Sequence, residues 1–174
     1  MQEKSKPPAN PYSITLNAKG FYTFNTDQDA NYFCKFLPAN DVLGPVLDLY
    51  DIEVFEFVFE KFDPEPPRRM YQDPRVSDTI QRIMHGFLSE DLRVMLYLCD
   101  SSDGRAEKRH RLFKRWYENF GDGFHNDNLK INFEGDYEPV YGSMITTEDF
   151  PHRDVLKREI FDKAEGLVLG KYGQ

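Results

Sequence analysis

The sequence predicts an α+β fold, with a mixed, mostly antiparallel sheet flanked by helices. Strand-like and helical segments alternate through the middle of the chain, and hairpin-like strand pairs stand near both ends. With 174 residues, the chain can bury a core without a disulfide or a metal. We assign residues 1–11 to a flexible N-terminal arm and residues 12–174 to a single domain. The expected order of elements is β-β-α-β-α-β-α-β-β-α.

The first part of the domain is expected to contain two short strands, a short helix and a long strand. Tyr12–Leu16 and Phe21–Thr26 form a hairpin around a turn that contains glycine. Apolar residues recur at helical spacing over Asp27–Phe36, which predicts a short helix capped by its aspartate. Leu47–Phe62 is apolar on both faces, so it is expected to be a central strand or one that is covered on both sides.

The second part repeats the alternation of helix and strand. An aspartate followed by proline at Asp73-Pro74 is typical of a helix start, and the segment His125–Asn128 is typical of a turn. The remaining expected elements are a helix over Asp73–Leu88, a buried strand over Leu92–Cys99, a basic helix over Gly104–Phe120, strands over Leu129–Phe133 and Tyr137–Thr146, and a helix over Arg153–Leu169.

Charge is unevenly distributed along the chain. The net charge is -8, and Asp48–Glu65 holds seven acidic residues and one lysine, whereas Arg105–Arg115 holds six basic residues and one acidic residue. An acidic protein repels nucleic-acid phosphate, so only the basic helix leaves nucleic-acid binding open. The N-terminus has no apolar signal segment, no stretch reaches the roughly 18 apolar residues of a membrane span, and both cysteines lie in apolar runs. We therefore expect a cytoplasmic location with reduced thiols.

The turn between the buried strand and the basic helix is the first candidate site. Asp100 and Asp103 follow the strand, and Arg105 and Arg109 stand on the first turns of the helix. Cations at a helix N-terminus oppose its dipole and need a partner. Either the two aspartates cap the helix and neutralise the arginines, or the arginines hold a bound anion.

Histidine and cysteine do not indicate a catalytic or metal site. The four histidines have no metal-ligand spacing, so no metal is predicted. Cys99 has no histidine placed to activate it and is expected to be a buried structural thiol.

Two segments carry a resemblance to a family of bacterial proteins. The strings CDSSDGR (Cys99–Arg105) and RHRLFKRWY (Arg109–Tyr117) resemble an uncharacterised family of small cytoplasmic proteins from Bacteroides-type bacteria. The resemblance extends from Tyr12–Thr26 to the last helix. It implies a single domain of unknown function and names no activity.

The element order from Leu47 onward is similar to the second half of a GNAT-type N-acyltransferase. That resemblance implies that the long strand splays from the next strand, with acyl-CoA entering the gap. The pyrophosphate would rest on the N-terminus of the intervening helix, near Arg68, Arg69 and Arg75. The glycine-rich pyrophosphate loop of that family is absent here, and Asp73-Pro74 stands in its place.

The sequence thus leaves three functions open. The favoured one is a binding or regulatory module with a GNAT-like core and no cofactor. The second is an atypical N-acyltransferase that uses acyl-CoA, with Tyr117 as the counterpart of the family's tyrosine acid. The third is a nucleic-acid or nucleotide binder that uses the basic helix over residues 105–115. Catalytic residues are unassigned, and a homodimer stays open.

Overall fold

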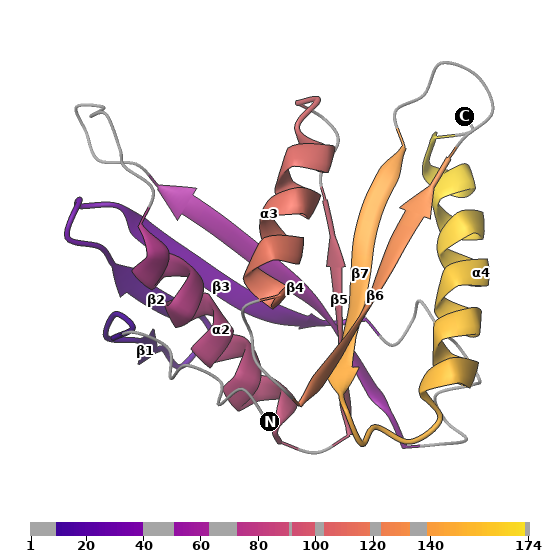
Figure 1. Ribbon diagram of the computed structural model, residues 1–174, viewed down its shortest axis with the longest axis horizontal. Coiled ribbons are helices and arrows are strands. Elements are labelled where there is room, and N and C mark those ends of the chain that lie inside the picture. The colour runs from indigo at the N-terminus through magenta and orange to yellow at the C-terminus, as the bar shows by residue number, and fades with distance from the viewer. Residues whose placement is uncertain are drawn as a thin grey trace, which may run out of the picture.

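The computed structural model describes residues 10–39, 51–62, 73–90, 92–99, 103–118, 123–132 and 139–172. Its centre is a seven-stranded sheet with the order β1-β2-β3-β4-β5-β7-β6 (Figure 1). All neighbouring strands are antiparallel except β4 and β5, which are parallel. The predicted α+β class and the mostly antiparallel sheet are confirmed.

The strands and helices have the following bounds. The strands are β1 (Thr15–Leu16), β2 (Tyr22–Asn25), β3 (Asn31–Pro38), β4 (Glu53–Phe62), β5 (Arg93–Leu98), β6 (Phe124–Ile131) and β7 (Val140–Thr147). The helices are α2 (Pro74–Leu88), α3 (Ala106–Glu118) and α4 (Arg153–Tyr172). None of the helices described is long and apolar enough to cross a membrane.

The prediction of a helix over Asp27–Phe36 is wrong, because this segment turns and then forms β3. Thr26 and Ala30 close a tight turn in which Asp29 has a φ of 60°. Burial then alternates along β3, with Tyr32, Cys34 and Phe36 inward. The same apolar residues fit a helical and an alternating pattern, and pairing with β2 on one side and β4 on the other decides for the strand.

Helices cover the two faces of the sheet unequally. The first core joins α2 and α3 to one face, which we call the front. The second, smaller core joins α4 to the other face, the back, through residues such as Val54, Val94 and Leu156. Alternation along β4 and β5 therefore directs Phe57, Phe59 and Tyr97 to the front and Val58, Phe62 and Leu98 to the back.

The strands β4 and β5 begin as neighbours and then diverge. Their pairing covers only Glu53–Glu56 of β4 against Arg93–Leu96 of β5, although β4 continues to Phe62. Figure 1 shows the two strands fanning apart beyond this point, with α3 lying between them in the view. We call this region the wedge; its borders are Phe57–Phe62 of β4 and Tyr97–Leu98 of β5.

Candidate functional site

Asp103 satisfies Arg109 and caps α3. Two guanidinium nitrogens of Arg109 donate to the two carboxylate oxygens of Asp103 over 2.7 and 2.6 Å. The backbone N–H of Arg105 donates to Asp103 Oδ1 over 3.1 Å. The hydrogen bond from Arg109 is the main reason that the pKa of Asp103 is lowered. The structural interpretation of the turn therefore holds for Asp103 and Arg109, whereas Asp100 lies outside the described residues.

The N-terminus of α2 is occupied by the protein's own side chains. Asp73 Oδ1 accepts a hydrogen bond from the Arg75 backbone N–H over 2.9 Å, and Asp73 Oδ2 accepts one from the Tyr12 hydroxyl over 2.5 Å. Burial and this carboxylate raise the pKa of Tyr12. A carboxylate thus stands where the GNAT resemblance implies a pyrophosphate.

Arg75 links the N-terminal segment to α2. Its Nη1 donates to Asp27 Oδ2 over 2.7 Å, its Nε donates to the carbonyl oxygen of Asn10 over 2.9 Å, and its guanidinium lies 3.9 Å from the centre of the Tyr12 ring. These contacts give the Arg75 side chain a structural role. Arg68 and Arg69 lie outside the described residues.

Aromatic contacts fix which flank of α3 faces which strand. The Trp116 and Phe59 ring centroids are 6.1 Å apart, so Trp116 faces β4. On the opposite flank, the His110 ring stacks on Tyr141 of β7 at 5.4 Å, and the Tyr117 hydroxyl donates to the carbonyl oxygen of Phe124. Burial raises the pKa of Tyr117, and this bond to the β6 backbone holds its hydroxyl away from the wedge.

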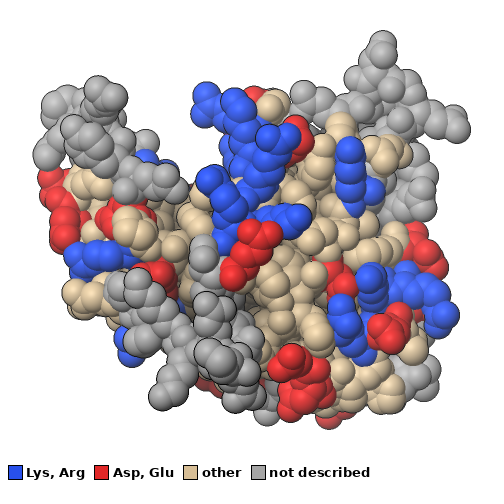
Figure 2. Space-filling view, viewed as in Figure 1, with Lys and Arg blue, Asp and Glu red and all other residues tan. Residues whose placement is uncertain are grey.

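The cations of α3 gather on its wedge-facing flank. Successive residues of a helix turn by about 100°, which places Lys108, Arg109 and Arg115 on the side of Trp116, and Arg105 immediately precedes the helix. Glu107 falls on the side of His110. Figure 2 shows Lys and Arg gathered over α3 and the surface hollowed beside it. We call Arg105, Lys108, Arg109 and Arg115 the cationic flank.

Only part of this charge is neutralised by acidic residues in the described chain. Arg109 pairs with Asp103, and Arg111 pairs with Glu107 over 2.5 Å. Within the described ranges, no carboxylate lies within salt-bridge distance of Arg105 or Lys108. Both side chains are exposed, so their charge is available to a partner.

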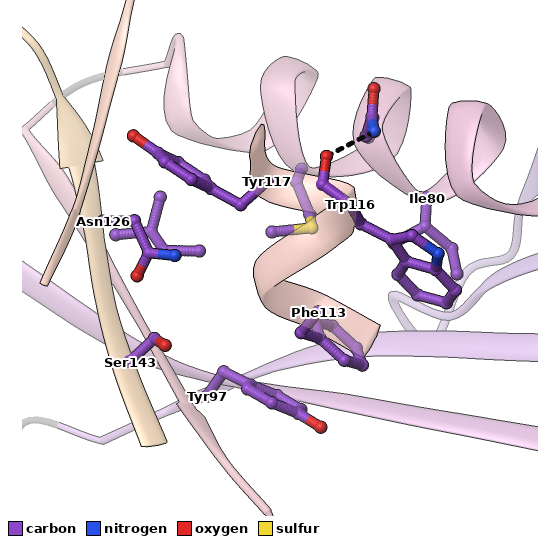
Figure 3. A pocket seen from close by; sticks show the side chains of 10 residues that line it. Ile80, Tyr97, Phe113, Trp116, Tyr117, Asn126 and Ser143 are labelled. Atoms are coloured by element: carbon purple, nitrogen blue, oxygen red, sulfur yellow. Dashed lines mark hydrogen bonds between the residues drawn. The ribbon is translucent and has the colours of Figure 1, made fainter. Parts of the chain in front are cut away.

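Aromatic side chains fill the front of the wedge. Phe113 of α3 stacks on Tyr97 at 3.8 Å and contacts Phe57 and Phe59 at 6.2 and 6.1 Å. Beside this cluster lies a cavity of about 10 Å³, lined by residues that include Tyr97, Phe113 and Trp116. Figure 3 shows these rings around it, with Gln81 Nε2 donating to the Trp116 carbonyl oxygen over 2.8 Å. Such a space holds about one water molecule.

The two cysteines lie in the core, as their apolar surroundings in the sequence predict. Cys34 and Cys99 are free and buried. Burial raises the pKa of Cys34 to about 12 and also raises that of Cys99. Among the described residues, no three potential ligands form a metal site.

A protein-family model matches residues 72–162, more than half of the chain, and its description is "Family of unknown function (DUF6169)". The chain belongs to this DUF6169 family. The matched segment contains α2, β5, α3, β6 and β7, and therefore one side of the wedge and the whole cationic flank. No curated protein and no solved structure matches the chain.

The sequence did not predict the buried ion cluster that lies on the back of this DUF6169 domain. Asp127, which is 6% exposed, accepts two hydrogen bonds of 2.8 Å from Arg153 and one of 2.8 Å from Lys157. The prediction of a turn over His125–Asn128 is wrong, because the segment belongs to β6 and pairs with β7. Four polar residues in a row suggest a turn, but two cations from α4 supply the partners that a buried carboxylate needs.

Proposed function

We propose that this DUF6169 protein is a binding module with a GNAT-like core that recognises an anionic partner through the cationic flank of α3. The observation that carries the proposal is that Arg105, Lys108 and Arg115 are exposed on the side of α3 that carries Trp116. Exposed cations at this density raise the local concentration of anions and speed their association. Free buried thiols support a reducing, cytoplasmic setting in a bacterial cell.

The GNAT-like core is supported by the divergence of β4 and β5, which that resemblance implies. The same divergence is the observation that favours an atypical N-acyltransferase as the second candidate. Two contacts favour the binding module over it. The Asp73 carboxylate occupies the helix N-terminus that would receive pyrophosphate, and Phe113 stacks on Tyr97 where the thioester arm would pass.

A thermal-shift titration separates these two candidates. Acetyl-CoA at millimolar concentration is expected to leave the melting temperature unchanged, because neither the phosphate site nor the acyl slot is open. A ligand at 100 times its dissociation constant stabilises a protein by roughly 2.7 kcal/mol. A saturable rise in melting temperature with acetyl-CoA would therefore favour the transferase.

The tryptophan supplies a reporter for the binding module. The chain contains one tryptophan, Trp116, and it lies on the flank that carries the cations. Polyglutamate, a simple polyanion, is expected to change Trp116 emission at low salt and to lose affinity as salt is added. A single-stranded RNA of equal charge tests the third candidate, nucleic-acid binding, under the same conditions.

A further inference from the structure

The cavity under α3 lies between the two helices of the front and the sheet. Its volume is about 10 Å³, and side chains such as Met84, Phe113 and Trp116 line it on the side of the helices. Asn126 of β6 and Ser143 of β7 line it on the side of the sheet. Figure 3 shows these two polar side chains on the same side of the cavity, opposite Phe113 and Trp116. We call Asn126 and Ser143 the polar wall.

The other polar side chains around the cavity already have partners. The side-chain amide of Gln81 donates to the last turn of α3. The Tyr117 hydroxyl donates to the carbonyl oxygen of Phe124, and the Tyr97 hydroxyl is hydrogen-bonded to the Cys99 thiol. In Figure 3 both hydroxyls point away from the cavity. These groups are therefore not available to the polar wall.

One atom of the polar wall has no hydrogen-bond partner in the described part of the chain. This atom is Oδ1 of Asn126, which is buried. A buried acceptor without a donor costs free energy, because it has lost its hydrogen bond to solvent. In folded proteins such atoms are satisfied by protein groups or by ordered water. Asn126 Oδ1 therefore needs a donor that the described residues do not supply.

The register of β6 against β7 sets the separation of the two residues in the polar wall. Asn126 pairs with Ile145, and Ser143 pairs with Asn128, so Asn126 and Ser143 are diagonal neighbours on the front of the sheet. Such neighbours are roughly 7–8 Å apart, and somewhat less between their Cβ atoms. A water molecule with two hydrogen bonds of about 2.8 Å spans roughly 5 Å between polar atoms. One water molecule therefore fits between the tips of these two side chains.

Ser143 has capacity left for a bond to such a water. Its hydroxyl donates to Asn128 Oδ1 over 3.3 Å, and the lone pairs of its oxygen remain able to accept. The residue is 7% exposed, so bulk solvent hardly reaches it. A buried water needs a space of about 10–15 Å³ and at least two polar partners. The cavity and the polar wall meet both conditions.

We propose that this cavity is a binding site for one structural water molecule, which donates one hydrogen bond to Asn126 Oδ1 and one to Ser143 Oγ. Two acceptors select a molecule with two donor hydrogens, and the volume excludes anything larger than water. The site goes beyond the proposed function, because no lysine or arginine lines the cavity. It allows β6 to carry a polar side chain under the helices without leaving its oxygen unsatisfied.

Nuclear Overhauser effects between water and the protein test the site in the wild type. Met84 and Ile145 both line the cavity, and their methyl protons do not exchange with solvent. A water held in the cavity is expected to give cross-peaks with these methyl groups. Absence of both cross-peaks would overturn the proposal.

Asn126→Leu distinguishes the water from the hydroxyl proton of Ser143, which can give similar cross-peaks. The substitution roughly keeps the volume of the side chain and removes the unpaired oxygen. The water then loses one of its two partners, and the cross-peaks should disappear. Asn128→Leu, at the exposed neighbouring position on the same face of β6, is the matched control and should retain them. Cross-peaks that persist in Asn126→Leu would come from a hydroxyl proton and would contradict the site.

Xenon tests the polarity of the cavity independently. Dry, apolar cavities bind xenon, whereas a bound water excludes it. The methyl shifts of Met84 and Ile145 in the wild type are therefore expected to stay constant under xenon pressure. Asn126→Ala combined with Ser143→Ala makes the wall apolar, and saturable methyl shifts are expected in that variant. Saturable shifts in the wild type would show a dry cavity and overturn the proposal, whether or not the variant folds.

Discussion

Two regions rich in cations lie on opposite faces of the sheet and use their charge differently. On the back, Arg153 and Lys157 converge on the buried carboxylate of Asp127. On the front, Arg105 and Lys108 project into solvent with no carboxylate within reach among the described residues. Charge that is buried must be partnered, whereas exposed charge need not be. The comparison separates cations that hold the fold together from cations that are available to a partner.

The largest expected effect concerns Asp127. Asp127→Asn removes the shared partner of Arg153 and Lys157 and is expected to lower the free energy of unfolding by about 2–3 kcal/mol, equivalent to a fall of roughly 5–10 °C in melting temperature. The exposed Asp162→Asn on α4 is the matched control and is expected to have almost no effect. Equal melting temperatures for the two variants would contradict the structural role of the cluster.

A smaller loss of stability is expected from a substitution at the start of α2. Asp73→Ala removes the cap on the Arg75 N–H and the acceptor of the Tyr12 hydroxyl, and is expected to cost about 1–2 kcal/mol in urea denaturation. Arg82→Gln, an exposed change in the middle of the same helix, should leave the midpoint in place. If Asp73→Ala were neutral, the N-terminus of α2 would be free to take an anion and the transferase would regain support.

Substitutions in the cationic flank are expected to weaken binding and to leave the stability of the fold almost unchanged. Arg105→Gln combined with Lys108→Gln should change stability by less than about 0.5 kcal/mol, because both side chains are exposed. The same variant should weaken polyglutamate binding about tenfold at low salt. Arg111→Gln, which removes a charge that is already paired with Glu107, is the control for lost charge. A large loss of stability in the double variant would show that these cations stabilise the fold, as Arg153 and Lys157 do.

The smallest expected effect depends on pH. Burial, reinforced by Lys114 and opposed by Glu107, lowers the pKa of His110. The folded protein therefore disfavours its protonation, so stability is fully present above the unfolded pKa of about 6.5 and declines as pH falls through the lower folded pKa. In His110→Gln, the free energy of unfolding should fall less between pH 7 and pH 5. An identical pH dependence in both proteins would rule out this contribution.

The sequence predicts the fold class and most elements because their apolar spacing is unambiguous. The stripe of α2 and the apolar run of β5 each fit one structure only. The segment that became β3 fits two, and partner strands from distant parts of the chain decide between them. Likewise, the polar run around Asp127 becomes a strand only because α4 brings two cations to it.

The candidate site was predictable in part for the same reason. The capping aspartate and the basic helix are local features, so Asp103, Arg105 and Arg109 could be identified from spacing. The wedge depends on where β4 stops pairing with β5, and the direction of the cationic flank depends on the contact of Trp116 with Phe59. Both features depend on tertiary contacts, which cannot be predicted from a local sequence pattern.

The most direct test is a salt series of polyglutamate binding, followed by Trp116 emission, in the wild type and in Arg105→Gln with Lys108→Gln. If the cationic flank is the binding surface, affinity should fall steeply with salt in the wild type, and the double variant should bind more weakly with a shallower slope. Equal affinities and equal slopes in the two proteins would contradict the assignment of the flank as the functional surface.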